Sequence, residues 1–260
     1  MKLSQSLLII FTLCVGLNSV FADEIQLSGG TTVEVPLADL LAPYHGYDNT
    51  NNVEVVLYGT LPNTCYRIDN TRIEKVSGTN SFRIRQFAVK KTDGVCGEEN
   101  TMPEHLKMAA PFTSVVSIGS LAPGDYSFNY NDGTSHVAQK SVNVKEAHKT
   151  TVDDYPYAAV SNVSTTDVIA KMDKIAVTLS GVFTSSCAYL DADSVAVDKQ
   201  KDVYVVLPVV KIKHGVLCAQ SLTPFLQQID MESPKSSGHY LVHVRSMNGK
   251  SVNRVVEALE

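Results

Sequence analysis

The chain has 260 residues, of which 44% are hydrophobic, and it carries 22 Lys and Arg against 27 Asp and Glu. The net charge of −5 provides no basic surface for nucleic acid or for anionic lipid, so these two classes of partner are excluded. The chain has no low-complexity tail, and we expect it to fold along most of its length.

The first 22 residues have the pattern of an export signal. Lys2 precedes an apolar stretch from Leu7 to Leu17, and the segment ends at Ala22 in the small residues that signal peptidases read. The apolar stretch is shorter than the ~20 residues that cross a bilayer as a helix. We expect residues 1–22 to be cleaved, leaving a periplasmic or secreted protein without a transmembrane segment.

Cleavage would remove Cys14 and leave four cysteines, an even number that suits an oxidising compartment. Four cysteines allow three pairings. They form two sets with the same spacing of 31 residues, offset by 122: Cys65 with Cys96, and Cys187 with Cys218. Because a repeat must fold both copies alike, this spacing predicts these two disulfides.

The sequence around the cysteines repeats as well. The segment with Val53, Val55, Leu57 and Gly59 recurs at the same offset as Ile175, Val177, Leu179 and Gly181. Later landmarks keep their order: Pro111-Phe112 and Gly124-Asp125-Tyr126 match Pro224-Phe225 and Gly238-His239-Tyr240. We therefore expect a leader at 1–22, copy one at 23–145, a linker at 146–153 and copy two at 154–260.

Copy one begins with an expected edge strand in residues 24–37, where Val33 and Val35 alternate with polar residues. After Cys96 this copy is longer than copy two, which predicts a loop insertion from Gly97 to Ala110. A short helix is expected there at Pro103 to Ala109. Insertions often carry specific function, and the insert contains the candidate partner-binding residues. They are Glu98, Glu99, Asn100, Met102, His105, Lys107 and Met108.

Alternation at period two predicts half-buried strands in both copies. In copy one, the apolar positions are Tyr126, Phe128 and Tyr130. In copy two, the alternating residues are Tyr240, Val242 and Val244, interleaved with His239, Leu241 and His243. The β-branched run from Asp202 to Lys213 is interrupted by Pro208, which predicts a strand that is bent or bulged at that point.

About seven or eight short strands per copy, joined by Gly, Pro and Asn turns, predict an all-β fold of two tandem β-sandwich domains, each with one intradomain disulfide. The segment from Leu121 to Tyr126 resembles the corner of fibronectin type III and immunoglobulin-like domains, where a tyrosine opens a strand after a Leu-x-Pro-Gly turn. In copy two, Ser233 to Tyr240 keeps the Gly and Tyr without the Leu-x-Pro order. The resemblance implies immunoglobulin-like domains of the kind found in bacterial extracytoplasmic proteins, and it implies binding or scaffolding.

The sequence contains neither Gly-x-Ser-x-Gly nor His-Glu-x-x-His. His239 and His243 share a face of an expected strand, but ~13 Å separates them, too far for one zinc with bonds of ~2 Å. We expect them to be solvent-exposed. The run of Asp191, Asp193 and Asp198 lacks the order of a calcium loop. No catalytic residue, metal ligand or cofactor is predicted.

A small cluster at the joint between the copies has two interpretations. Asp153 and Asp154 lie beside Tyr155 and Tyr157. They could mark a binding edge between the domains, or they could form an ordinary acidic linker.

These patterns predict a non-enzymatic binding, adhesion or envelope-scaffold protein. Its partner would be a protein or glycan of the cell envelope or extracellular space, recognised through sandwich loops or edge strands. The alternative is a secreted inhibitor of a hydrolase that acts through the Gly97 to Ala110 loop. An enzyme would require His, Asp and Tyr to cluster in a groove between the domains.

Overall fold

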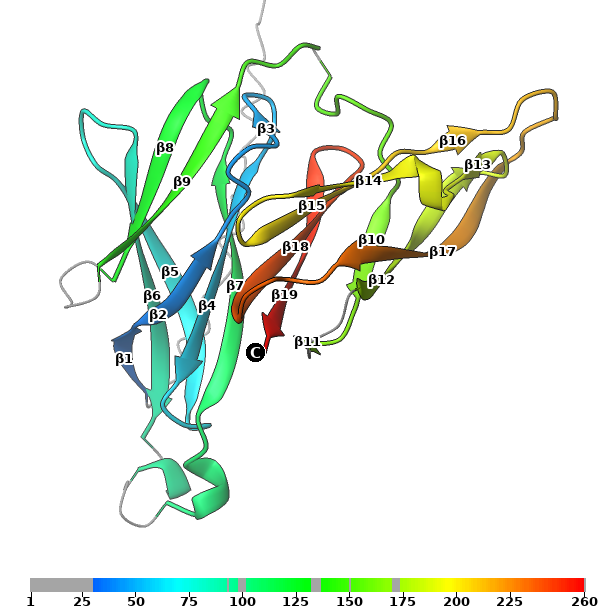
Figure 1. Ribbon diagram of the computed structural model, residues 1–260. Coiled ribbons are helices and arrows are strands. Elements are labelled where there is room, and N and C mark those ends of the chain that lie inside the picture. The colour runs from blue at the N-terminus through cyan, green and yellow to red at the C-terminus, as the bar shows by residue number, and fades with distance from the viewer. Residues whose placement is uncertain are drawn as a thin grey trace, which may run out of the picture.

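The computed structural model describes residues 30–92, 94–97, 102–131, 137–149, 151–169 and 174–259. The expected leader, residues 1–22, lies outside the described residues. Figure 1 shows two β-sandwiches joined by a linker that crosses from the end of β9 to the start of β10. In the part of the chain that the structure describes, no helix is long and apolar enough to cross a membrane.

Copy one folds as two facing sheets. One sheet has the order β2-β4-β7, and the other has the order β1-β6-β8-β9-β3 with β5 also paired to β6. The strands are β1 (Gly30–Val35), β2 (Leu37–Leu41), β3 (Tyr47–Asp48), β4 (Val53–Leu61), β5 (Tyr66–Lys75), β6 (Ser81–Lys91), β7 (Ala110–Gly119), β8 (Gly124–Tyr130) and β9 (Ala138–Lys145). The expected edge strand of residues 24–37 is confirmed as β1 over its described part.

Copy two has the same plan, with sheets β10-β12-β17 and β11-β19-β18-β15-β14 and a short pair β13-β16. The strands are β10 (Val160–Ser164), β11 (Val168–Ile169), β12 (Lys174–Ser185), β13 (Ala188–Tyr189), β14 (Val195–Lys199), β15 (Val203–Pro208), β16 (Lys211–Ile212), β17 (Gln220–Glu232), β18 (Gly238–Ser246) and β19 (Lys250–Ala258). β15 ends at Pro208 and β16 begins at Lys211, so the β-branched run is divided at the proline.

The two copies share their strand pairings as well as their strand order. In both, the strand after the tyrosine corner pairs in parallel with an earlier strand, β8 with β6 and β18 with β15. The immunoglobulin sandwich is built from antiparallel sheets, so this parallel pairing is a feature of the present repeat. Both predicted disulfides are present, Cys65–Cys96 and Cys187–Cys218.

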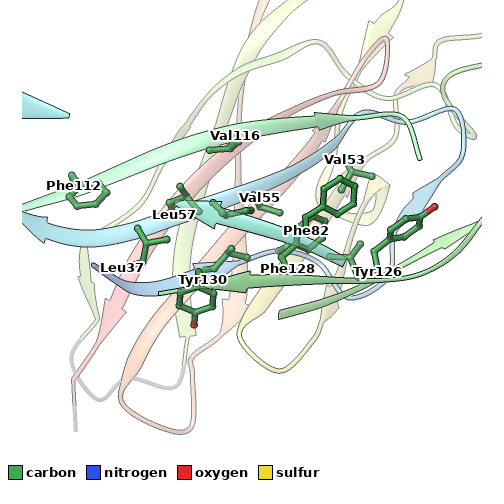
Figure 2. Close-up of a cluster of buried hydrophobic side chains, with 14 of the residues drawn as sticks. Leu37, Val53, Val55, Leu57, Phe82, Phe112, Val116, Tyr126, Phe128 and Tyr130 are labelled. Atoms are coloured by element: carbon green, nitrogen blue, oxygen red, sulfur yellow. The ribbon is translucent and has the colours of Figure 1, made fainter. Parts of the chain in front are cut away.

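The core of each copy lies between its two sheets. Figure 2 shows Leu57 and Val55 of β4 facing Phe128 and Tyr130 of β8 across the core of copy one. The predicted alternation of β8 is confirmed, since Tyr126, Phe128 and Tyr130 are all buried. Burying apolar surface between the sheets provides the main driving force for this fold.

The tyrosine corner predicted in copy one is present in both copies. The hydroxyl of Tyr126 donates to the carbonyl of Ala122 at 2.8 Å, four residues earlier. The hydroxyl of Tyr240 donates to the carbonyl of Ser236 at 3.0 Å, also four residues earlier. Copy two therefore keeps the corner without the Leu-x-Pro sequence, because the bond is made to a backbone carbonyl.

The two domains share an apolar interface, formed by outer sheet faces. Leu41 and Val56 of copy one pack with Val203, Val205 and Leu241 of copy two. β18 is therefore buried on both faces, so the expectation of a half-buried strand is wrong for copy two. The expectation that His243 is solvent-exposed is wrong for the same reason, since its side chain is buried against copy one.

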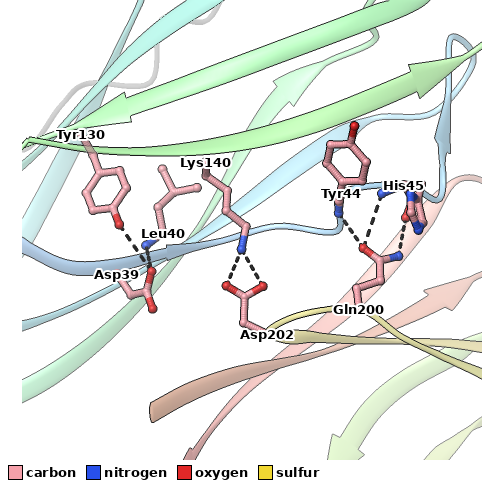
Figure 3. Close-up of polar contacts among 8 residues, drawn as sticks. All are labelled: Asp39, Leu40, Tyr44, His45, Tyr130, Lys140, Gln200 and Asp202. Carbon is pink, nitrogen blue, oxygen red and sulfur yellow. Dashed lines mark hydrogen bonds and ion pairs between the residues drawn. The ribbon is translucent and has the colours of Figure 1, made fainter. Parts of the chain in front are cut away.

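Polar contacts surround this interface. Figure 3 shows Lys140 of β9 paired with Asp202 of copy two, with Nζ 2.6 Å from Oδ1. It also shows Gln200, whose amide accepts from the Tyr44 N–H at 2.6 Å and donates to the His45 carbonyl at 2.8 Å. Elsewhere Asn253 donates to Glu54 Oε2 at 2.9 Å. These bonds fix how the two domains are oriented.

Candidate functional site

An apolar groove of about 430 Å³ lies where the linker enters copy two. Tyr155, Pro156 and Tyr157 of the linker form one wall. The ends of β12 and β16 and the short β13 form the rest, mainly through Val182, Phe183, Ala188, Val210 and Ile212. Four apolar residues of the groove remain accessible: Tyr155 is 56% exposed, Ile212 48%, Val182 38% and Met247 38%.

The groove exists because β12 extends past its neighbour β10. The pairing of β10 with β12 ends at Val160 and Gly181, whereas β12 continues to Ser185. Before Val160 the chain crosses to the other sheet, where the Ala158 N–H donates to the Pro208 carbonyl at 2.8 Å. Among the described strands, none follows β12 beyond Gly181 on the β10 side.

In copy one the equivalent place is filled by a strand. β1 pairs antiparallel with β6, from Gly30 opposite Lys91 to Val35 opposite Gln86, while β5 pairs with the other side of β6. In copy two the counterparts of β6 and β5 at this end are β16 and β13. The only described pairing on the β1 side is the isolated bridge between Tyr157 and Val209. Copy two thus lacks a counterpart of most of β1.

Val152 and Asp153, which precede the aromatic wall, are fixed by bonds to other parts of the molecule. The Asp153 carboxylate accepts from the backbone N–H groups of Asn248, at 2.6 Å, and Gly249, at 2.7 Å, in the turn between β18 and β19. The Val152 carbonyl accepts from the Asn51 side chain of copy one at 3.0 Å. These contacts tie the residues that would correspond to β1 to the joint between the domains.

The two tyrosines of the groove wall contact each other and neighbouring cationic side chains. The Tyr155 and Tyr157 rings meet edge to face at 6.2 Å, and the Arg245 guanidinium lies 5.6 Å from the centre of the Tyr157 ring. The pKa of Tyr157 is raised, chiefly by burial, so its hydroxyl stays neutral. Lys149 lies over the outer Tyr155 ring at 5.5 Å. Lys149 and Asp153 are thus engaged with the protein, and the apolar wall beside them stays accessible.

The binding edge hypothesised for Asp153, Asp154, Tyr155 and Tyr157 falls on this groove, since all four residues line it. The residues contributed by β12 and β16 were not foreseen. Their sequence signal is weak, because Val182, Phe183 and Ile212 look like any residues of a β-sandwich.

The insert that carries the other candidate residues is folded against its disulfide. Met102 is buried with Cys65 and Cys96, so it anchors the insert and is not available for contact with a partner. His105, Lys107 and Met108 are exposed. Glu98, Glu99 and Asn100 lie outside the described residues. The expected short helix is a single 3-10 turn, η3 (Glu104–Leu106).

A second, more polar cleft of about 450 Å³ lies between the domains. It brings together Tyr58, His239, Asp167, Arg254 and Glu257, with the Tyr58 and His239 rings 3.9 Å apart. Arg254 is paired with Asp167. Within the described residues, no hydrogen bond links His239 to a nucleophile or to an orienting carboxylate, and no group of acidic, His or Cys side chains could hold a metal. The cleft thus gathers His, Asp and Tyr side chains, and among the described residues no hydrogen bond arranges them as a catalytic triad.

Neither a protein-family model, nor a curated protein sequence, nor a solved structure matches this chain significantly.

Proposed function

We propose that this is an exported, non-enzymatic recognition protein that binds a protein partner through the groove beside the linker. The observation that carries the proposal is the open groove in copy two at the place where copy one holds its own strand β1. An apolar groove with exposed aromatic and aliphatic residues suits a polypeptide better than a glycan. Export is supported by the two disulfides, which suit an oxidising compartment.

The rigid arrangement of the domains also supports recognition. The groove is built from the linker and from β12, β13 and β16, and the linker is bonded to both domains. A site held in this way is formed before its ligand arrives, which lowers the entropic cost of binding. Scaffolding alone would not require the accessible apolar wall.

The test is selection of peptide ligands from a display library on the chain lacking residues 1–22. Selected peptides should bind the parent protein and bind Ile212→Glu at least tenfold more weakly. Leu226→Glu is the matched control, because Leu226 is 77% exposed on β17 of the same domain and does not line the groove. Peptides that bind all three proteins equally would contradict the proposal.

The inhibitor hypothesis has one observation in its favour. The insert of residues 97–110 is tethered by Cys65–Cys96 and by Met102, so its exposed part projects from a fixed base. Inhibition of a panel of secreted proteases by the parent protein, lost when residues 103–109 are replaced by a Gly-Ser linker, would support this second function. The groove variant Ile212→Glu would leave such inhibition unchanged.

A further inference from the structure

We infer that the groove binds an extended segment of a partner protein, which adds as a strand antiparallel to β16 and carries an apolar side chain at every second position. This inference rests on the proposed function and specifies the chemistry of its ligand. The template for the ligand is β1, which occupies the equivalent place in copy one.

The backbone provides the first argument. β6 in copy one is paired on both sides at this end, with β5 and with β1. β16 in copy two is paired with β13 alone among the described strands. An unpaired strand edge presents N–H and C=O groups that an added strand can satisfy. The Ala158 N–H donates to the Pro208 carbonyl, and the Pro156 carbonyl accepts from the Val210 N–H. These two bonds cover only the inner end of this edge.

The side chains provide the second argument. In β1, Val35 is buried and Val33 is partly buried against the core, whereas Glu34 is exposed and bonds to Arg85. A strand placed likewise in copy two would direct alternate side chains toward Phe183, Val210 and Ile212, which line the groove. These apolar residues favour Val, Ile or Leu at the inward positions of the ligand.

The molecule does not supply this strand from its own linker. The residues that precede Tyr157 correspond to β1, but Val152 and Asp153 are held by Asn51 and by the turn at Asn248 and Gly249. Moving them into the groove would break those bonds at the joint. Among the described segments the linker therefore does not supply the strand, and we assign it to another polypeptide. Its length would be about four or five residues, roughly 13–17 Å.

The experiment uses a capped peptide with the sequence of β1, Gly-Thr-Thr-Val-Glu-Val, titrated into the isotope-labelled chain lacking residues 1–22 and followed by NMR. We expect shifts confined to residues 153–157, 182–188 and 209–212, which hold the groove wall. Binding should weaken at least tenfold in Ile212→Glu and stay unchanged in Leu226→Glu. A second variant, Tyr155→Ala, changes only an exposed wall residue and keeps the test valid if Ile212→Glu does not fold.

Peptides methylated at single backbone nitrogens then test the strand geometry. An added strand donates from every second residue, so methylation should weaken binding at least tenfold at alternate positions and little between them. A peptide of the same composition with its valines adjacent should bind at least tenfold more weakly. No binding of the β1 peptide, or equal effects of methylation at neighbouring positions, would overturn strand addition. The groove would remain a binding site if library-selected peptides still depended on Ile212, so the two failures are distinguishable.

Discussion

Gly59 and Gly181 occupy equivalent positions in the two copies, and each lies against the ring of a phenylalanine, Phe112 or Phe225. A Cβ at Gly59 would lie 2.6 Å from the Phe112 ring and 3.2 Å from the Pro36 carbonyl oxygen. A Cβ at Gly181 would lie 2.8 Å from the Phe225 ring and 2.0 Å from the Ala159 carbonyl oxygen. The close approach at Gly181 is therefore to backbone, which cannot rotate away.

We expect Gly181→Ala to lower the free energy of unfolding by about 3 kcal/mol and Gly59→Ala by about 1–2 kcal/mol, the upper and middle parts of the range for overpacking. Urea denaturation followed by circular dichroism measures both. Equal effects would show that the Ala159 carbonyl can move. In that case the start of β10, and with it the groove wall, would be more adaptable than the structure indicates.

The strands and the disulfides could be predicted from the sequence because their causes are local or periodic. The alternation in residues 124–130 reflects one buried and one exposed face, and the spacing of the cysteines reflects the repeat. The burial of His243 could not be predicted, because it depends on how copy one packs on the outer face of β18. Alternating apolar and polar residues predict a strand with one buried face and one solvent-exposed face. Both faces of β18 are buried.

The groove was predicted only in part, for a related reason. Asp153, Asp154, Tyr155 and Tyr157 are adjacent in sequence and were recognised as a cluster. Val182 and Ile212 join them through the ends of two strands that are far apart in sequence. Their role depends on a strand that copy two lacks. An absence of this kind becomes visible only when the two copies are compared in three dimensions.

The apolar interface should make the two domains unfold together. Val56 is 1% exposed and packs against copy two, whereas its neighbour Val115, directly opposite on β7 and on the same sheet face, is 50% exposed. We expect Val56→Asp to split a single calorimetric transition into two, because a buried unpaired charge breaks the interface and leaves each core intact. Val115→Asp should keep one transition. A single transition in Val56→Asp would mean that the polar contacts suffice to couple the domains.

His243 should make stability depend on pH. Its Nδ1 lies 2.8 Å from the Asn253 Oδ1, and the Tyr47 ring and the buried Arg245 are close to it. Burial, with a smaller contribution from the Arg245 charge, lowers the pKa of His243 from 6.5 to about 4. The unfolded chain therefore binds a proton below pH 6.5 that the folded chain binds only near pH 4, so stability falls as the pH drops through this window.

The expected loss from His243 between pH 7 and pH 4 is about 3 kcal/mol, from about 1.4 kcal/mol per pKa unit. Urea denaturation at pH 7, 5.5 and 4.5 measures it. His243→Gln should be less stable at pH 7 but lose less stability on acidification, since Gln does not titrate. Parallel pH profiles for the two proteins would show that carboxylates, and not His243, cause the acid sensitivity.

The two disulfides should differ in their resistance to reduction. Cys65 is 1% and Cys96 8% exposed, and Met102 covers them. Cys187 is also buried, but Cys218 is exposed beyond β16. Thiol–disulfide exchange requires a thiolate to reach a sulfur atom of the bridge. We therefore expect dilute dithiothreitol to reduce Cys187–Cys218 first. Alkylation and peptide mass spectrometry at timed intervals would show which cysteines are labelled. Labelling of Cys65 and Cys96 at the same rate would indicate that the insert opens readily.

Opening the second bridge has a consequence for the groove. The bridge closes a loop of 31 residues that contains β13 and β16, and the loop-entropy model assigns such a closure ~3.5–4 kcal/mol. Cys187→Ser with Cys218→Ser should therefore lower the free energy of unfolding by that order and weaken groove-directed peptides, because Ala188 and Ile212 line the groove. The double variant Cys65→Ser with Cys96→Ser should lower the free energy of unfolding by a similar amount and leave peptide binding unchanged. If both double variants bound peptides alike, β13 and β16 would hold their pairing without the covalent link, and the wall formed by β12 and the linker would dominate recognition.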